Sequence, residues 1–241
     1  MNNDDISLFC DSEMNAFRLN LAAELVLGCR YTNKEMSGTA KNIEGSCKDY
    51  NDLRERALDE CLAVLEIEPR NCLAHYIAGR AYTRTEPSCN DSEKTLSYKA
   101  AVHYERALDC IKDGHEYKAL IFLPADKCHD ESLDLDTKVK LGLAELYAEA
   151  GLVYMETYRW PEAAACYKKV TEYDPLRTTG WMWLAKSLFE TEGVDRAIGV
   201  INYALGLDKQ HANFEPVLKS YLKKYTAIAA QRDGFLKTTS R

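Results

Sequence analysis

Two adjacent segments, Ala144 to Pro175 and Thr178 to Gln210, carry the same order of small and large apolar residues, 34 positions apart (144 to 178). Within each segment the apolar residues recur at i, i+3, i+4 and i+7, the spacing that places them on one side of an α-helix. Alanine or glycine stands where two such helices must approach closely. The pattern predicts two short helices per segment, with matching positions at Tyr147, Ala150, Gly151, Tyr154, Ala163, Tyr167, Val170 and Pro175, and at Trp181, Leu184, Ala185, Leu188, Ala197, Ile201 and Ala204.

The residues between the predicted helices suit tight turns. Pro161 follows Trp160 where the second helix of the first segment would begin, and proline is tolerated there because its missing N–H would have no partner. Glu192, Gly193 and Val194 supply the turn in the other segment. The sequence therefore predicts two consecutive helix–turn–helix repeats, at 144–177 and 178–211.

A helix–turn–helix repeat of this length and pattern resembles the tetratricopeptide repeat (TPR) family. The resemblance implies an all-α fold, a TPR-like helical-repeat solenoid whose repeats stack as a right-handed superhelix. It also reveals two degenerate repeats upstream, at 21–70 and 72–114, interrupted by inserted loops at Thr32 to Lys48 and Arg84 to Ser92. An irregular all-helical bundle is the alternative. The matching residues are Leu27, Gly28, Tyr31, Ala57, Cys61, Val64 and Pro69, then Ala78, Gly79, Tyr82, Ala100, Tyr104 and Ala107.

Two segments outside the repeats complete the predicted single domain, 1–241. The connecting segment 115–143 holds an apolar run, Ala119 to Pro124, and then an acidic stretch, Asp130 to Asp136. The apolar run either tucks against the solenoid or forms an exposed docking motif. After the last repeat, 213–232 has one apolar and one polar helical face, which predicts a C-terminal capping helix over the end of the solenoid. Its basic residues either form a solvated face or meet an acidic partner.

Composition narrows the function classes. The net charge of -7 and the pI near 5.4 argue against a protein that mainly binds nucleic acid. An RNA-binding TPR-like superhelix stays an alternative, and it would need a cationic channel to which Arg80 and Lys186 contribute. No apolar run approaches 18 residues, so we expect no membrane insertion. Nine cysteines without a CxxC pair or a secretory signal predict reduced thiols in the cytoplasm, with the nucleus as the alternative.

Motifs for catalysis are missing from the sequence, which has no Gly-rich phosphate loop, no GxSxG and no HExxH. Cys72 with His75, and Cys128 with His129, could begin a zinc site, but neither pair has a second pair at a recognisable spacing. We therefore expect no enzymatic activity, no cofactor and no metal.

The TPR resemblance directs attention to the surface. In that family the first helix of each repeat lines a concave groove where peptides bind. The implied function is a non-catalytic protein-protein interaction adaptor, scaffold or complex subunit that binds a peptide or helix of a partner in this groove. A carboxylate-clamp co-chaperone is disfavoured, because Leu25 and Cys29 stand where a clamp has lysine and asparagine. Alternatively, some of these side chains pack within the chain itself. The groove positions are Leu73, Tyr76, Arg80, Thr83, Glu145, Ala148, Leu152, Met155, Thr179, Met182, Lys186 and Phe189, with Ala22, Leu25, Cys29 and Thr32 in the first repeat.

Overall fold

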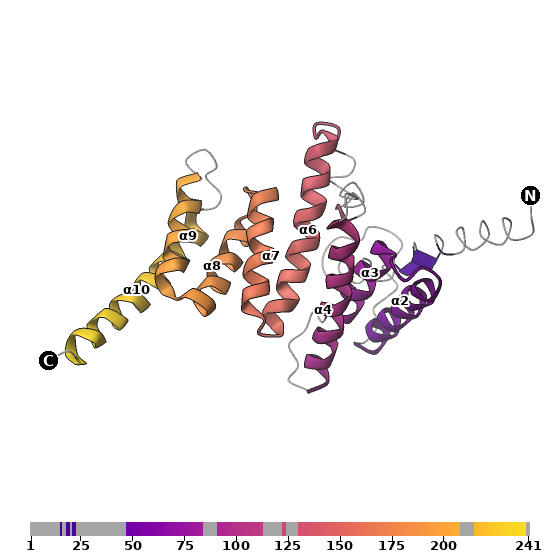
Figure 1. The fold of residues 1–241 in the computed structure, drawn as a ribbon, viewed down its shortest axis with the longest axis horizontal. Coiled ribbons are helices and arrows are strands. Elements are labelled where there is room, and N and C mark those ends of the chain that lie inside the picture. Colours follow the sequence, from indigo (N-terminus) through magenta and orange to yellow (C-terminus); the bar gives the residue numbers. More distant parts are fainter. Residues whose placement is uncertain are drawn as a thin grey trace, which may run out of the picture. The chain divides into compact units, whose positions relative to one another are not determined.

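The computed structural model describes residues 15, 18–19, 21–22, 47–83, 91–112, 122–123, 130–207 and 215–239. The chain divides into two compact units, Met1–Lys118 and Ala119–Arg241, here called the N-terminal and C-terminal units. The described residues contain helices and no β-strand, which confirms the predicted all-α helical-repeat fold (Figure 1). The helices are α2 (Cys47–Ile67), α3 (Cys72–Tyr82), α4 (Asp91–Lys112), α6 (Leu135–Glu156), α7 (Trp160–Tyr173), α8 (Thr178–Glu192), α9 (Val194–Leu207) and α10 (Glu215–Thr239).

In the N-terminal unit, α3 packs against both α2 and α4. Asn71 caps the start of α3, and its side-chain oxygen accepts a hydrogen bond of 3.0 Å from the Ala74 N–H. Gly79 lets α4 approach closely, because a Cβ at this position would lie 3.0 Å from Cζ of Tyr104. The small-against-large pattern read from the sequence is therefore the contact that joins α3 to α4.

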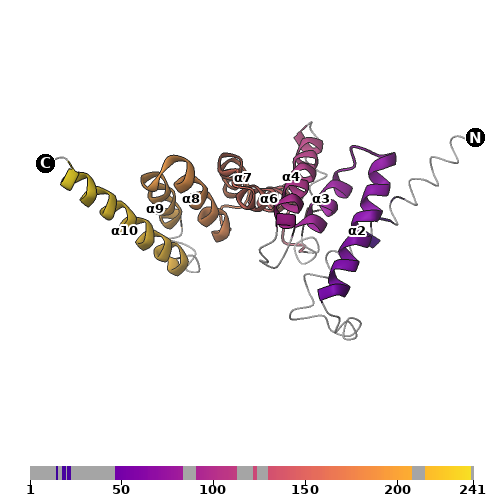
Figure 2. The same ribbon diagram turned by 90° about the horizontal axis from the view of Figure 1, so that it is seen from below.

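In the C-terminal unit, each helix from α6 to α9 packs on the next, and α10 packs on α9 and α8 (Figures 1 and 2). Gly151 repeats the role of Gly79, since a Cβ there would lie 2.9 Å from the ring of Tyr167. Leu218 and Tyr225 of α10 are buried. This helix therefore covers the end of the α8–α9 pair with an apolar face, as a capping helix does.

The turns follow the sequence signals. Pro161 lies in the first turn of α7, and Gly193 ends α8 with a φ of 94°, a conformation that side chains disfavour. The end of α6 is less expected. Tyr158 has a φ of 60°, with its N–H donating to Met155 O and the Arg159 N–H donating to Tyr154 O at 3.1 and 2.7 Å. These two bonds form a Schellman motif with tyrosine at the position where glycine is usual.

Several helix ends differ from the predicted bounds. Helix α2 begins at Cys47 and α4 at Asp91, so each inserted loop ends earlier than expected; residues 32–46 and 84–90 lie outside the described residues. Helix α6 begins at Leu135, inside the predicted connecting segment, because Asp134 caps it by accepting a 2.7 Å hydrogen bond from the Thr137 N–H. The acidic stretch thus starts a helix, and the first two residues of this helix, Leu135 and Asp136, are exposed.

Other boundaries extend or fall outside the prediction. Helix α10 continues to Thr239, beyond the predicted 232. Phe122 and Leu123 of the connecting segment are buried, which argues against an exposed docking motif at these two residues. Residues 23–31, with the first-helix signature of the first repeat, and residues 208–214 lie outside the described part of the chain.

Candidate partner-binding surfaces

Arg177 links two of the predicted groove positions, Glu145 of α6 and Thr179 of α8. Arg177, at the start of α8, donates to Glu145 Oε2 of α6 at 2.7 Å and to Thr179 Oγ1 of α8 at 3.3 Å. Further along, Lys186 of α8 lies near Trp160, the first residue of α7, which comes shortly after the end of α6 at Glu156. The two predicted rows of residues therefore run side by side, in the same direction.

Lys186 is held by aromatic rings. Its Nζ lies 5.7 Å from the ring centre of Trp160 and 5.4 Å from that of Trp183. Two indole faces attract an ammonium group through their electron-rich π systems. Among the described residues no carboxylate forms a salt bridge with Lys186. The result is a positioned cation whose remaining N–H groups can meet a ligand.

On the same two helices, Ala148, Leu152 and Met182 are half-buried. With Glu145, Thr179 and Lys186 they form a surface that we call the α6–α8 face. It combines apolar area with one ion pair at one end and one cation at the other.

Two of the predicted groove residues instead belong to the core. Met155 is 7% exposed and Tyr76 is 5% exposed. Met155 follows Gly151 by four residues, so it lies on the side of α6 that meets α7. Tyr76 precedes Gly79 by three and packs edge-on to Tyr104 of α4, with ring centres 6.1 Å apart. Neither side chain is available to a partner.

Phe189 packs within the chain. Its ring stacks on Tyr225 of α10 at a centroid distance of 5.3 Å, and burial raises the pKa of the Tyr225 hydroxyl to about 12. The alternative of self-packing therefore holds at this position. The capping helix covers the end of the row to which Phe189 belongs.

The α3 positions form a separate set in the N-terminal unit. Arg80 Nη1 donates to the Tyr76 hydroxyl at 3.1 Å, and its guanidinium lies 5.5 Å from the centre of the same ring. Thr83 Oγ1 donates to Gly79 O at 2.8 Å, and Leu73 is half-buried. Among the described groove positions, Arg80 and Lys186 thus fall in different units and each already lies over a ring. A continuous cationic lining for RNA does not follow from them.

A second surface was not predicted from the sequence. A cleft of about 710 Å³ lies between α7 and α9, with α8 as its floor. The four α8 residues in it are Trp181, Leu184, Leu188 and Glu192, which lie on another side of α8 from the predicted groove positions. The other lining residues are Pro161, Ala164, Ala165, Lys168, Thr171, Glu172, Pro175, Arg196, Val200, Tyr203 and Leu207.

One sequence signal could have revealed this cleft. Ala197, Ile201 and Ala204 form the core stripe of α9, but Val200, Tyr203 and Leu207 form a second apolar stripe beside it. Tyr203 is 62% exposed and Leu207 is 45% exposed. A helix with two apolar stripes has more apolar surface than its own repeat can bury.

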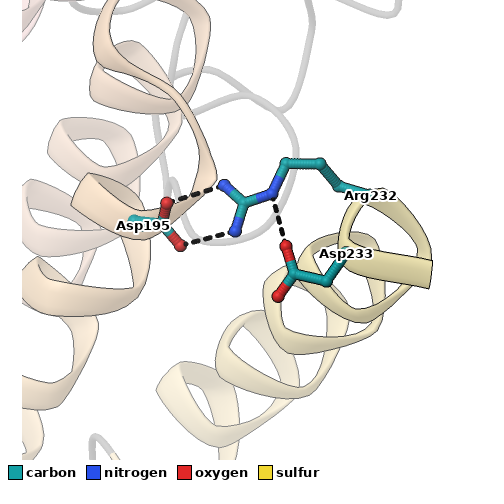
Figure 3. A network of polar contacts seen from close by, with 3 residues as sticks. All are labelled: Asp195, Arg232 and Asp233. Carbon is teal, nitrogen blue, oxygen red and sulfur yellow. Dashed lines mark hydrogen bonds and ion pairs between the residues drawn. The ribbon is translucent and has the colours of Figure 1, made fainter. Parts of the chain in front are cut away.

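An exposed ion-pair network holds the capping helix to α9 (Figure 3). Arg232 of α10 donates to both carboxylate oxygens of Asp195, at 2.6 and 3.2 Å, and to Asp233 at 2.9 Å. The hydrogen bond from Arg232 lowers the pKa of Asp195. Such exposed pairs add little stability, but a bidentate pair fixes orientation. Arg232 is therefore engaged within the chain, whereas Lys223 and Lys224 of α10 are exposed.

The described residues contain no group of three or more metal-ligating side chains. Cys72 is buried without a disulfide, and Nδ1 of His75, three residues later on α3, lies 3.0 Å from Nδ1 of His103. Within the same part of the chain, no helix combines the length and the apolar character needed to cross a membrane.

Comparisons with known proteins add little to this picture. No protein-family model matches the chain, and no curated protein sequence matches it. Among solved structures, the chain is similar to YrrB, described as a TPR protein with an unusual peptide-binding site. The match has 21% sequence identity and a TM-score of 0.29, and it covers 84% of this chain and 99% of YrrB. The packing of the helices themselves remains the ground for the fold.

Proposed function

We propose that this protein is a non-catalytic interaction module, an adaptor or complex subunit, that binds a peptide or helix of a partner protein on the α6–α8 face. The observation that carries the proposal is Lys186, held over Trp160 and Trp183 beside half-buried apolar side chains. A cation fixed next to apolar area can orient a ligand that offers both an anionic and an apolar group.

Specificity on this face would come from few charges. The carboxylate of Glu145 is paired with Arg177, so Lys186 is the cation left to attract a ligand. A carboxylate clamp needs several converging cationic and amide donors, and one lysine does not provide them. The proposed ligand is therefore an apolar segment with one acidic group, rather than a highly charged terminus.

The test replaces Met182 or Leu152 with aspartate. Both side chains are half-buried, so the change places a charge in the contact without removing a core residue. Met155 and Phe189 are poor choices, because one is buried and the other packs on Tyr225. Lys223→Asp, on the exposed side of α10, is the matched control.

The measurement is affinity purification with quantitative mass spectrometry, with circular dichroism on the same variants. We expect the wild type and the control to recover the same proteins. The recovered amount of these proteins should fall at least about tenfold with Met182→Asp. If the folded variants recover the same proteins as wild type, this face is not the binding site. An RNA-binding function would instead show RNA retention that falls steeply with salt and with Lys186→Glu.

A further inference from the structure

We infer that the cleft between α7 and α9 is a second docking site, which takes an amphipathic helix of a partner protein with an acidic side chain beside its apolar ridge. This inference does not depend on the α6–α8 face. It rests on the shape of the cleft, its exposed apolar lining and the charges at its walls.

The shape of the cleft fits a helix. Lining residues run from Pro161 to Glu172 on α7 and from Arg196 to Leu207 on α9, with α8 between them. Each run spans about 16 Å at 1.5 Å per residue, or about three helical turns. The side-chain ridge of one helix packs into such a groove between others. On the α7 wall, Ala164 and Ala165 are small enough to allow a close approach.

The lining is apolar at the level where a ligand would lie. Trp181 and Leu184 form a buried floor, and Tyr203 lies beside Trp181 with ring centres 5.6 Å apart. Tyr203 and Leu207 expose about half of their surface or more to solvent. These two residues gain most from being covered, so they are the expected energetic centre of the contact.

Hydrogen-bonding capacity favours a helix over an extended peptide. The Trp181 Nε1–H already donates to Pro175 O at 2.8 Å, and Thr171 Oγ1 donates to Lys168 O at 2.8 Å. The walls are helices, whose backbone groups bond internally. An extended segment would lose water from its N–H and C=O groups without finding partners, whereas a helix satisfies its own.

The charged residues of the cleft indicate which charge the bound helix should carry. Both acidic residues of the lining are already paired, Glu172 with Lys169 at 2.6 Å and Glu192 with Arg196 at 3.0 Å. Lys168, exposed on the α7 wall, forms no salt bridge with any described residue. An acidic side chain at the edge of the incoming ridge complements this cation.

The probe is a phage-displayed library of amphipathic helices of about four turns, roughly 15 residues, varied at the inward and flanking positions. It is selected on the wild-type protein and then measured as free peptides. We expect the selected ridges to be aliphatic or aromatic, with Asp or Glu enriched at one flanking position. Tyr203→Asp should weaken binding at least about tenfold. Lys168→Glu should weaken acidic peptides about threefold and strengthen their lysine-substituted versions.

The controls separate the two surfaces. Lys223→Glu repeats the charge change outside the cleft, and Met182→Asp tests the α6–α8 face. Peptides that tolerate Tyr203→Asp but lose binding with Met182→Asp would overturn the cleft site and leave the proposed function standing. Failure to enrich any helix would also overturn it, as would selected peptides that ignore both Tyr203→Asp and Lys168→Glu. Binding lost with Tyr203→Asp alone would support the cleft and leave the α6–α8 face to its own test.

Discussion

The helix pairs α3–α4 and α6–α7 use the same contact and differ in what surrounds it. In each pair a glycine of the first helix faces the ring of a tyrosine in the second, Gly79 with Tyr104 and Gly151 with Tyr167. Beside this contact α3–α4 holds two histidines in contact, whereas α6–α7 ends its first helix with exposed Tyr158 against Trp160. The shared contact sets how closely the helices pack, and the differing neighbours give the two pairs different polar and aromatic groups beside it.

The histidine pair of α3–α4 has one consistent protonation pattern. His75 Nε2 lies 3.0 Å from Pro69 O, a carbonyl that can only accept, so this nitrogen carries the proton. His75 Nδ1 then accepts from the Nδ1–H of His103, also at 3.0 Å. Burial lowers the pKa of both rings, and that of His103 falls to about 4, with the neighbouring charges of His75 and Arg106 adding to the effect.

The largest expected effect tests what the two pairs share. Tyr104 and Tyr167 are almost fully buried, so Tyr104→Ala and Tyr167→Ala should each lower the free energy of unfolding by about 3–5 kcal/mol. Urea denaturation measures both, and Phe in place of each tyrosine gives a milder variant should Ala prevent folding. A large loss of unfolding free energy in only one of the two pairs would show that the glycine–tyrosine contact does not have the same role in both.

Enlarging the buried alanines of these helices should lower the stability less than removing the tyrosines, and by a similar amount in each helix pair. Ala100 in α4 and Ala163 in α7 are fully buried, as is Ala197 in α9. Leucine at any of them should overpack the helix contact and lower the free energy of unfolding by about 1–3 kcal/mol. Lys223→Leu, at an exposed position of α10, should change it little. Equal losses in thermal melts at Lys223 and at the alanines would show that the helix register is wrong.

The pH dependence of stability should distinguish the α3–α4 pair, which holds the two histidines, from the α6–α7 pair. The folded state holds His75 and His103 neutral, with pKa values below the 6.5 of an unfolded histidine. Below pH 6.5 the unfolded chain therefore takes up protons that the folded chain does not. The stability present above that pH is lost progressively toward about pH 4. From pH 7 to 5, His103 alone should remove about 2 kcal/mol.

The measurement is urea unfolding at both pH values, with His103→Gln as the comparison. Glutamine can still donate a hydrogen bond toward His75 but does not titrate, so part of the pH dependence should disappear. An unchanged pH dependence in the variant would place its origin outside the α3–α4 pair.

The smallest effect concerns how the first helices end. Tyr158 has a positive φ that costs about 1–2 kcal/mol in a residue with a Cβ, so Tyr158→Gly should stabilise by about 0.5–1 kcal/mol after loss of the Trp160 contact. Thr83 ends α3 with extended backbone and bonds to Gly79 O, so Thr83→Gly should destabilise by a similar amount. Thermal unfolding should show a higher melting temperature for Tyr158→Gly and a lower one for Thr83→Gly. A loss with Tyr158→Gly would mean that the ring contact outweighs the strain.

Much of the fold could be predicted because its signals are local. The helical spacing, Pro161 and Gly193 act within one helix or turn, and the glycines act on the next helix of the same repeat; the structure has them where expected. The early start of α6 escaped prediction because its cap, Asp134, lies in the acidic stretch and the first turn after it is mostly polar.

The candidate sites were predicted only in part, because exposure depends on three or more helices at once. The sequence placed Lys186 on the correct helix, but only the tertiary structure set it between Trp160 and Trp183. Likewise, only the tertiary structure shows that Met155 is buried and that a cleft lies on another side of α8. The sequence by itself determined which residues share a helix face. The packing of neighbouring helices decided which of those faces remain open to a partner, because burial is a property of the assembled helices and not of any one of them.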